Sequence, residues 1–178
     1  MKNFLLKSMS IVFFLLLVGC QLNTITTNNA TKGFSEPGSS DWVAYMKPIR
    51  EYMYYRTQAV INKDIDILWA KYPEIKNDRD FEKGINVEKD ELDSLNMGFE
   101  LIDANYDIEA YEPIKVKTIS EEEVVALVHA SIVYLSNDFE ESGGEYLIEI
   151  SLVKEEDQWT VVKTDEYTMP EYKEWLEE

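Results

Sequence analysis

The stretch YLIEISLVKEEDQWTVVKTDEY, residues 146–167, decides the fold because it reads as two strands joined by a tight turn. Its first half carries an apolar residue at every second position, as a strand with one buried face does. These positions are Tyr146, Ile148, Ile150 and Leu152. The polar residues 155–158 form the turn, and Trp159, Val161 and Lys163 return antiparallel.

More strands are predicted upstream of this hairpin. Residues 124–135, VVALVHASIVYL, are apolar on both faces, which is typical of a central strand covered on two sides. Alternating patterns over residues 106–110 and 114–118 predict two further strands. The glycine-containing residues 140–144, EESGG, are expected to form a loop.

Helices precede the strands. Apolar residues recur at spacings of three and four over residues 41–61, which predicts a long amphipathic helix that Pro48 should kink or delay. A second helix is expected to begin at Asp64 and to stop before Pro73. The remaining predicted helices span residue 86 to about residue 100 and residues 170–178. Helices followed by strands favour an α+β fold, with N-terminal helices packed on a curved antiparallel sheet.

This order of elements resembles the NTF2-like superfamily. The resemblance rests on the long helix, on the short helix NKDIDILWAKY at 62–72, and on the closing strands 146–167. It implies a curved antiparallel sheet that wraps the helices into a cone with a pocket. The charged segment 74–95 and the added terminal helix depart from the family pattern. NTF2-like folds include isomerases, dehydratases, hydrolases and non-catalytic binding modules, so the fold alone does not assign a function.

The N-terminus resembles that of a bacterial lipoprotein. Two lysines, Lys2 and Lys7, flank an apolar run at 11–18 that is too short for a stable membrane-spanning helix. Leu17-Val18-Gly19-Cys20 then matches the lipobox, in which the cysteine is acylated and becomes the first mature residue. The predicted organisation is a signal peptide at 1–19, a lipid-anchored flexible tether at 20–40, and an NTF2-like α+β domain at 41–178.

The anchor and the charge of the chain restrict its partners. The resemblance places the protein at the extracytoplasmic face of the cell membrane, held through acyl chains on Cys20. The formal net charge is −18. It becomes −20 after cleavage, because Lys2 and Lys7 leave with the signal peptide and no acid does. Such a charge repels phosphate backbones, which argues against nucleic-acid binding, and it attracts cations and basic peptides.

No motif predicts a metal or a cofactor. The sequence has no zinc-ligand spacing, no nucleophile motif and no glycine-rich phosphate loop. An EF-hand beginning at Asp78 would place Lys83 at the glycine position and Lys89 at the glutamate position. We therefore expect neither a metal site nor a cofactor.

Five residues are candidates for a pocket. His129 would serve as a general base if it lined the cone, although it would equally fit a buried position in the core or on the far face of the sheet. Asp103 would be a base and Tyr45 or Tyr52 a hydrogen-bond donor in an isomerase like the ketosteroid enzymes of the superfamily. Trp69 extends the same aromatic helical region, which is also consistent with plain core packing.

These observations favour a non-catalytic role. We expect the domain to bind a small ligand or an envelope protein partner at the outer face of the membrane. The alternative is a small cofactor-independent isomerase or lyase that uses a pocket acid, tyrosine or histidine. A homodimer formed through an open sheet face is a further possibility for such a fold.

Overall fold

The computed structural model describes residues 33–79, 84–98, 100–108 and 115–168. The predicted signal peptide, Cys20, part of the predicted tether and the predicted terminal helix lie outside these residues. Within the described part of the chain, no helix is both long enough and apolar enough to cross a membrane.

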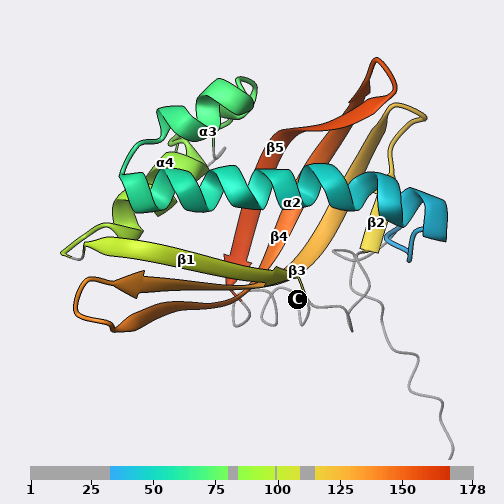
Figure 1. Ribbon diagram of the computed structural model, residues 1–178. Coiled ribbons are helices and arrows are strands. Elements are labelled where there is room, and N and C mark those ends of the chain that lie inside the picture. The colour runs from blue at the N-terminus through green and yellow to red at the C-terminus, as the bar shows by residue number, and fades with distance from the viewer. Residues whose placement is uncertain (1–32, 80–83, 99, 109–114, 169–178) are drawn as a thin grey trace, which may run out of the picture.

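The helices come first in the chain and lie on one face of an antiparallel sheet (Figure 1). The helical elements are α2 (Ser39–Asn62), α3 (Asp66–Lys71), the 3-10 helix η2 (Ile75–Asn77) and α4 (Val87–Leu95). The strands are β1 (Leu101–Ile108), β2 (Lys115–Thr118), β3 (Glu123–Ser136), β4 (Glu141–Glu155) and β5 (Gln158–Thr168). This arrangement confirms the predicted α+β class.

The sheet has the order β1-β3-β4-β5, and β2 also pairs with β3. β1 pairs with the second half of β3 and β2 with the first half, so both lie along the same side of the central strand. The hairpin predicted from residues 146–167 is present: Glu155 pairs with Gln158 across the turn.

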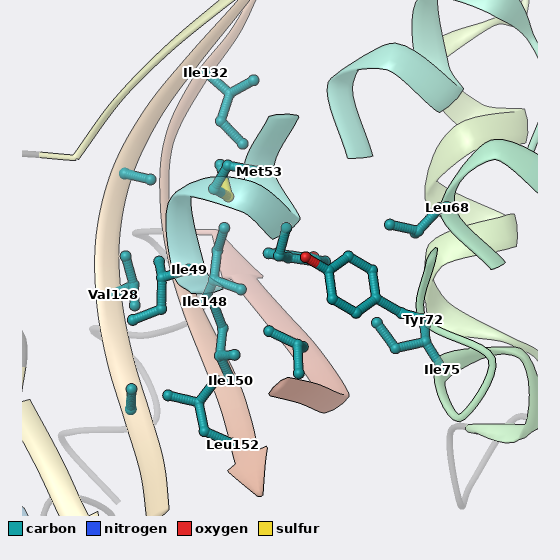
Figure 2. Packing of buried hydrophobic residues seen from close by; sticks show 14 of the residues in the cluster. Ile49, Met53, Leu68, Tyr72, Ile75, Val128, Ile132, Ile148, Ile150 and Leu152 are labelled. Carbon is teal, nitrogen blue, oxygen red and sulfur yellow. The ribbon is translucent and has the colours of Figure 1, made fainter. Parts of the chain in front are cut away.

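The long helix α2 crosses the sheet, and the core lies between them (Figure 2). Ile49 and Met53 on α2 meet alternate residues of β3 and β4, which face the helix because strand side chains alternate between the two faces. Tyr72 extends from the end of α3 into the same cluster. Each large apolar side chain buried in this way contributes roughly 1.5 to 3 kcal/mol to stability.

Helix α2 begins ahead of its predicted start. Its first residue is Ser39, and Asp41 lies in its first turn. Pro48 lies inside the helix, so it does not delay the start. Just before the helix, Ser35 exchanges backbone hydrogen bonds of 2.8 and 2.9 Å with Val116 of β2. The C-terminal part of the predicted tether is therefore in contact with the sheet.

Three further predicted boundaries are wrong. The strand predicted from residue 106 begins at Leu101. The third helix ends at Leu95, not near residue 100. Gly98, three residues later, has a φ of 88°, which is incompatible with a continuing helix, and β1 begins at Leu101. Residues 140–144 are not a loop, because β4 begins at Glu141 and pairs with the end of β3.

Candidate functional site

A buried arginine interrupts the apolar stripe of α2. Arg56 lies one turn after Tyr52 and one turn before Val60, and its side chain is only 4% exposed. Residues at this spacing share a helix face, so the guanidinium points toward the interior together with apolar neighbours. An ion in such a position requires partners, because desolvating an unpaired charge is very costly.

Two glutamates from distant parts of the chain supply these partners. Nε of Arg56 lies 3.3 Å from Oε2 of Glu88 on α4, and Nη2 lies 2.5 Å from Oε2 of Glu166 on β5. The side chains of Glu88 and Glu166 are 6% and 13% exposed. One cation thus joins α2, α4 and β5 in a region with little solvent.

Glu88 is the most highly connected member of this network. Its Oε1 accepts hydrogen bonds from the hydroxyl of Tyr52 at 2.6 Å and from Oγ1 of Thr164 at 2.5 Å. Its Oε2 accepts the bond from Arg56. All four side chains are buried. Three donors on two elements therefore hold the Glu88 carboxylate in place.

Asn86 positions the helix that carries Glu88. As the N-cap of α4, its Oδ1 accepts a hydrogen bond of 3.0 Å from the backbone N–H of Lys89. Its Nδ2 donates to the carbonyl oxygens of Ile75 and Asp78 at 2.7 and 2.8 Å. The buried Asn86 side chain thus links the segment of Ile75 and Asp78 to the first turn of α4. These bonds fix the position from which Glu88 extends into the interior.

A cavity of about 400 Å³ lies beside this network, between α2, α4 and the last two strands. Arg56, Glu88 and Glu166 are part of its wall. The remaining lining residues are Tyr52, Ile85, Val87, Asp90, Glu91, Ser94, Leu95, Tyr146, Ile148, Thr164 and Asp165. Among the residues that the structure describes, no group of histidine, cysteine, aspartate and glutamate side chains is arranged to hold a metal ion.

The environment of Glu166 makes its carboxyl group titrate near neutrality. Burial raises its pKa from 4.5 to about 7, although the positive charge of Arg56 acts in the opposite direction. The nearby acids Glu91, Glu88 and Asp165 add to the increase. Glu166 is thus a cavity residue whose charge changes in the physiological pH range.

The tyrosines of the site stay protonated. Burial raises the pKa of Tyr52 well above its usual value, and the Glu88 carboxylate adds to this effect. Burial likewise raises the pKa of Tyr134 to about 12. Both phenols therefore keep their protons at neutral pH, and Tyr52 donates a hydrogen bond to Glu88.

The titration of Glu166 predicts a pH-dependent stability. Its pKa is higher in the folded state than in the unfolded state, so the folded protein binds more protons between pH 4.5 and 7 and loses stability as pH rises through this window. The loss amounts to about 3 kcal/mol. We expect Glu166→Gln to lack this loss. In urea unfolding, the free energy of unfolding of the variant should therefore rise relative to that of the wild type from pH 5 to pH 8.

The matched control for this measurement is Glu141→Gln, at an exposed position at the start of β4. Its unfolding free energy should follow that of the wild type at every pH. Parallel curves for the wild type and Glu166→Gln would contradict the assignment of the titrating group.

Of the five pocket residues predicted from the sequence, Tyr52 lines this cavity and the other four do not. Tyr45 packs edge-on against Trp159 with ring centroids 5.2 Å apart. Trp69 is half-buried on α3, with Nζ of Lys76 4.9 Å from its ring centroid. Asp103 is exposed on β1.

His129 lies on the far face of the sheet, which is one of the positions considered for it. Its even-numbered neighbours on β3 belong to the core beneath α2, so His129 points the other way together with Leu127. Its Nε2 lies 3.7 Å from Oε2 of Glu145. It therefore does not contribute to the cavity beside Arg56.

Sequence reasoning missed Arg56, Glu88 and Glu166. The available signal was a charged residue within an apolar helical stripe, since Arg56 continues the spacing of Tyr52 and Val60. No comparable signal identified Glu88 in the charged segment 74–95 or Glu166 among the acids of the last strand.

Comparison with known proteins gives structural neighbours only. No family model matches the chain, and no curated protein matches it. An NTF2-like protein of unknown function from Shewanella baltica has 16% identity and a TM-score of 0.40, with 72% of this chain and 96% of that chain covered. A protein provisionally named scytalone dehydratase from Novosphingobium aromaticivorans has 16% identity and a TM-score of 0.46, with 73% and 88% covered.

Proteins described as NTF2-like are thus among the structural neighbours of the chain. Similarities at this level of identity and TM-score support no statement about activity or ligand.

Proposed function

We propose that the chain is a lipid-anchored, extracytoplasmic binding protein whose domain holds a small ligand in the cavity between α2, α4 and β5. It binds this ligand without transforming it. The lipobox at residues 17–20 supports the anchor, and the cavity supports the ligand. Alternatively, the domain binds an envelope protein partner.

The observation that carries the binding role is the buried Arg56 network at the wall of the cavity. Replacing a buried ion pair or triad by apolar residues of similar volume is often neutral or stabilising. Such a network is therefore weak evidence for a purely structural role. Fixed polar groups beside a partly apolar cavity are the usual composition of a small-molecule site.

The binding role is tested on the full-length protein, purified from membranes in a non-ionic detergent. Small molecules are released by denaturation and identified by mass spectrometry. Ser94 on α4 lines the cavity, so Ser94→Trp should fill it and remove the bound compound. Asp93→Trp, at an exposed position on the same helix that is not part of the lining, should retain the compound. Equal recovery from the wild type and Ser94→Trp would contradict the proposal.

A second candidate function is a cofactor-independent isomerase or lyase. It is favoured by Glu166, since a carboxyl with a pKa of about 7 at a cavity suits general acid–base catalysis near neutral pH. The recovered compound decides between the two functions. Incubation with fresh wild-type protein leaves it unchanged if the protein only binds it, whereas an enzyme converts it and Glu166→Gln loses that conversion.

The anchor has a separate test. Cys20→Ser should release the protein from membranes or leave an uncleaved precursor, because the thiol that accepts the acyl chains is gone. Cell fractionation and immunoblotting measure both outcomes. Membrane attachment of a fully processed Cys20→Ser form would contradict the lipoprotein assignment.

The homodimer through the sheet face stays a prediction. The molar mass of the purified protein in solution is the measurement that tests it.

A further inference from the structure

We propose that the cavity binds a small organic cation, an amine or guanidine with an apolar body, and that the Glu166 carboxylate is its counter-ion. This inference rests on the proposed binding function and specifies the chemical class of the ligand.

The charges around the cavity are unbalanced. Among the described residues that line it, Arg56 is the one with a positive charge, and Glu88 and Glu166 already engage it. The acidic lining residues are Glu88, Asp90, Glu91, Asp165 and Glu166. An anionic ligand would meet these acids without a free cation, whereas a cation would meet an excess of negative charge.

Glu166 is the carboxylate that lacks sufficient compensation. Arg56 contacts its Oε2, and no donor to Oε1 is found among the described residues. Even with Arg56 at 2.5 Å, burial and the surrounding acids hold the pKa of Glu166 at about 7. A second positive charge at this oxygen would favour the ionised form. Glu88 differs, because three donors already hold it.

The rest of the lining suits an apolar body. Ile85, Val87, Leu95 and Ile148 provide aliphatic surface, and Tyr146 provides an aromatic ring. An aromatic face attracts an ammonium or guanidinium group in addition to any carboxylate. The cavity therefore matches a cation attached to a hydrocarbon chain or ring more closely than it matches a bare metal ion.

Binding should depend on pH through Glu166. The titratable or charged groups that interact electrostatically with it are Arg56 on α2, Glu88 and Glu91 on α4, Tyr134 on β3, Tyr146 on β4 and Asp165 on β5. Below pH 7 Glu166 gains a proton, and the attraction for a cation decreases. Between pH 8 and pH 5.5 its ionised fraction falls about 30-fold, which sets the size of the expected change in affinity.

The experiment is isothermal titration of the full-length protein in non-ionic detergent with 2-phenylethylamine and agmatine. The neutral isostere 2-phenylethanol and the anion phenylacetate are the comparison compounds. We expect at least one cation to bind at least tenfold more tightly than both comparison compounds at pH 8, and about 30-fold more weakly at pH 5.5. Glu166→Gln should remove the pH dependence of the affinity, and Ser94→Trp should abolish binding. Glu141→Gln should bind the cation with the affinity and pH dependence of the wild type.

Two results would overturn the inference. One is tighter binding of phenylethanol or phenylacetate than of either cation, with loss of that binding in Ser94→Trp. That result retains the cavity as a binding site and rejects only the ligand class. The other is a Kd above about 1 mM for both cations at pH 8. The compound released from the purified protein then separates the two proposals. Recovery of a neutral or anionic compound would support the binding function and reject the cationic ligand. Recovery of no compound would contradict the binding function itself.

Discussion

Gly143→Ala should lower the free energy of unfolding by about 3 kcal/mol or more. Gly143 has a φ of +120° and pairs with Val133 of β3. A Cβ atom at this position would lie 2.1 Å from the carbonyl oxygen of Ile132 and 3.0 Å from its carbonyl carbon. Both are backbone atoms, so the β3–β4 pairing must shift to make room. Urea and thermal unfolding measure the loss, with a decrease in Tm on the order of 10 °C.

The neighbouring glycine provides the control. A Cβ atom on Gly144 would have no heavy atom within 4 Å, and its φ lies outside the left-handed region. Gly144→Ala should therefore change the unfolding free energy by less than about 1 kcal/mol. Equal effects of the two substitutions would show that loss of glycine itself, and not the approach to Ile132, determines the stability.

Arg56→Met should lower the free energy of unfolding by about 3 to 5 kcal/mol at pH 8, because it leaves two carboxylates buried without their cation. Glu88 would keep its bonds from Tyr52 and Thr164, whereas Glu166 would lose its donor. The loss should be smaller at pH 5, where Glu166 is protonated. Urea unfolding at the two pH values measures the difference.

A double-mutant cycle and a matched arginine complete this test. In the Arg56→Met background, Glu166→Gln should recover part of the lost stability, since it removes the uncompensated charge. Arg50 lies on the same helix with an exposed side chain, and Arg50→Met should have an effect within about 0.5 kcal/mol. A loss below 1 kcal/mol for Arg56→Met would show that water reaches the network and screens its charges.

Local patterns were sufficient for the main elements of the fold. An apolar run on both faces predicted a strand at residues 124–135, and β3 spans Glu123–Ser136. The helical spacing predicted residues 41–61, and α2 spans Ser39–Asn62. In each segment the distribution of apolar residues matches the faces that the structure buries.

Glycines were harder to interpret. The pair at 143–144 indicates a loop from composition alone, but Gly143 serves an extended strand that approaches Ile132 too closely for a side chain. Near Gly98 the opposite error occurred, because the predicted helix ran through this glycine to about residue 100, whereas α4 ends at Leu95 and Gly98 has a φ of 88°. In both cases the backbone conformation depends on contacts that the local sequence does not specify.

The site depended on distant pairing. Arg56 is 32 residues from Glu88 and 110 residues from Glu166 along the chain. The sequence contains 35 acidic residues, so nothing local singles out the two that reach the arginine. Tyr52 was predicted from an aromatic stripe, and it reaches the site because that stripe also carries Arg56.

The Asn86 cap has a consequence for the dynamics of the cavity wall. Helix α4 has nine residues, and a helix this short is marginal without external contacts. It is held at its start by the Asn86 amide and on its inner side by Glu88, whereas β3 pairs with β1 and β2 on one side and with β4 on the other. Local opening therefore requires less free energy in α4 than in the sheet, and its amide protons should exchange with solvent first. Fraying of α4 would therefore open the wall of the cavity while the remainder of the domain stays folded.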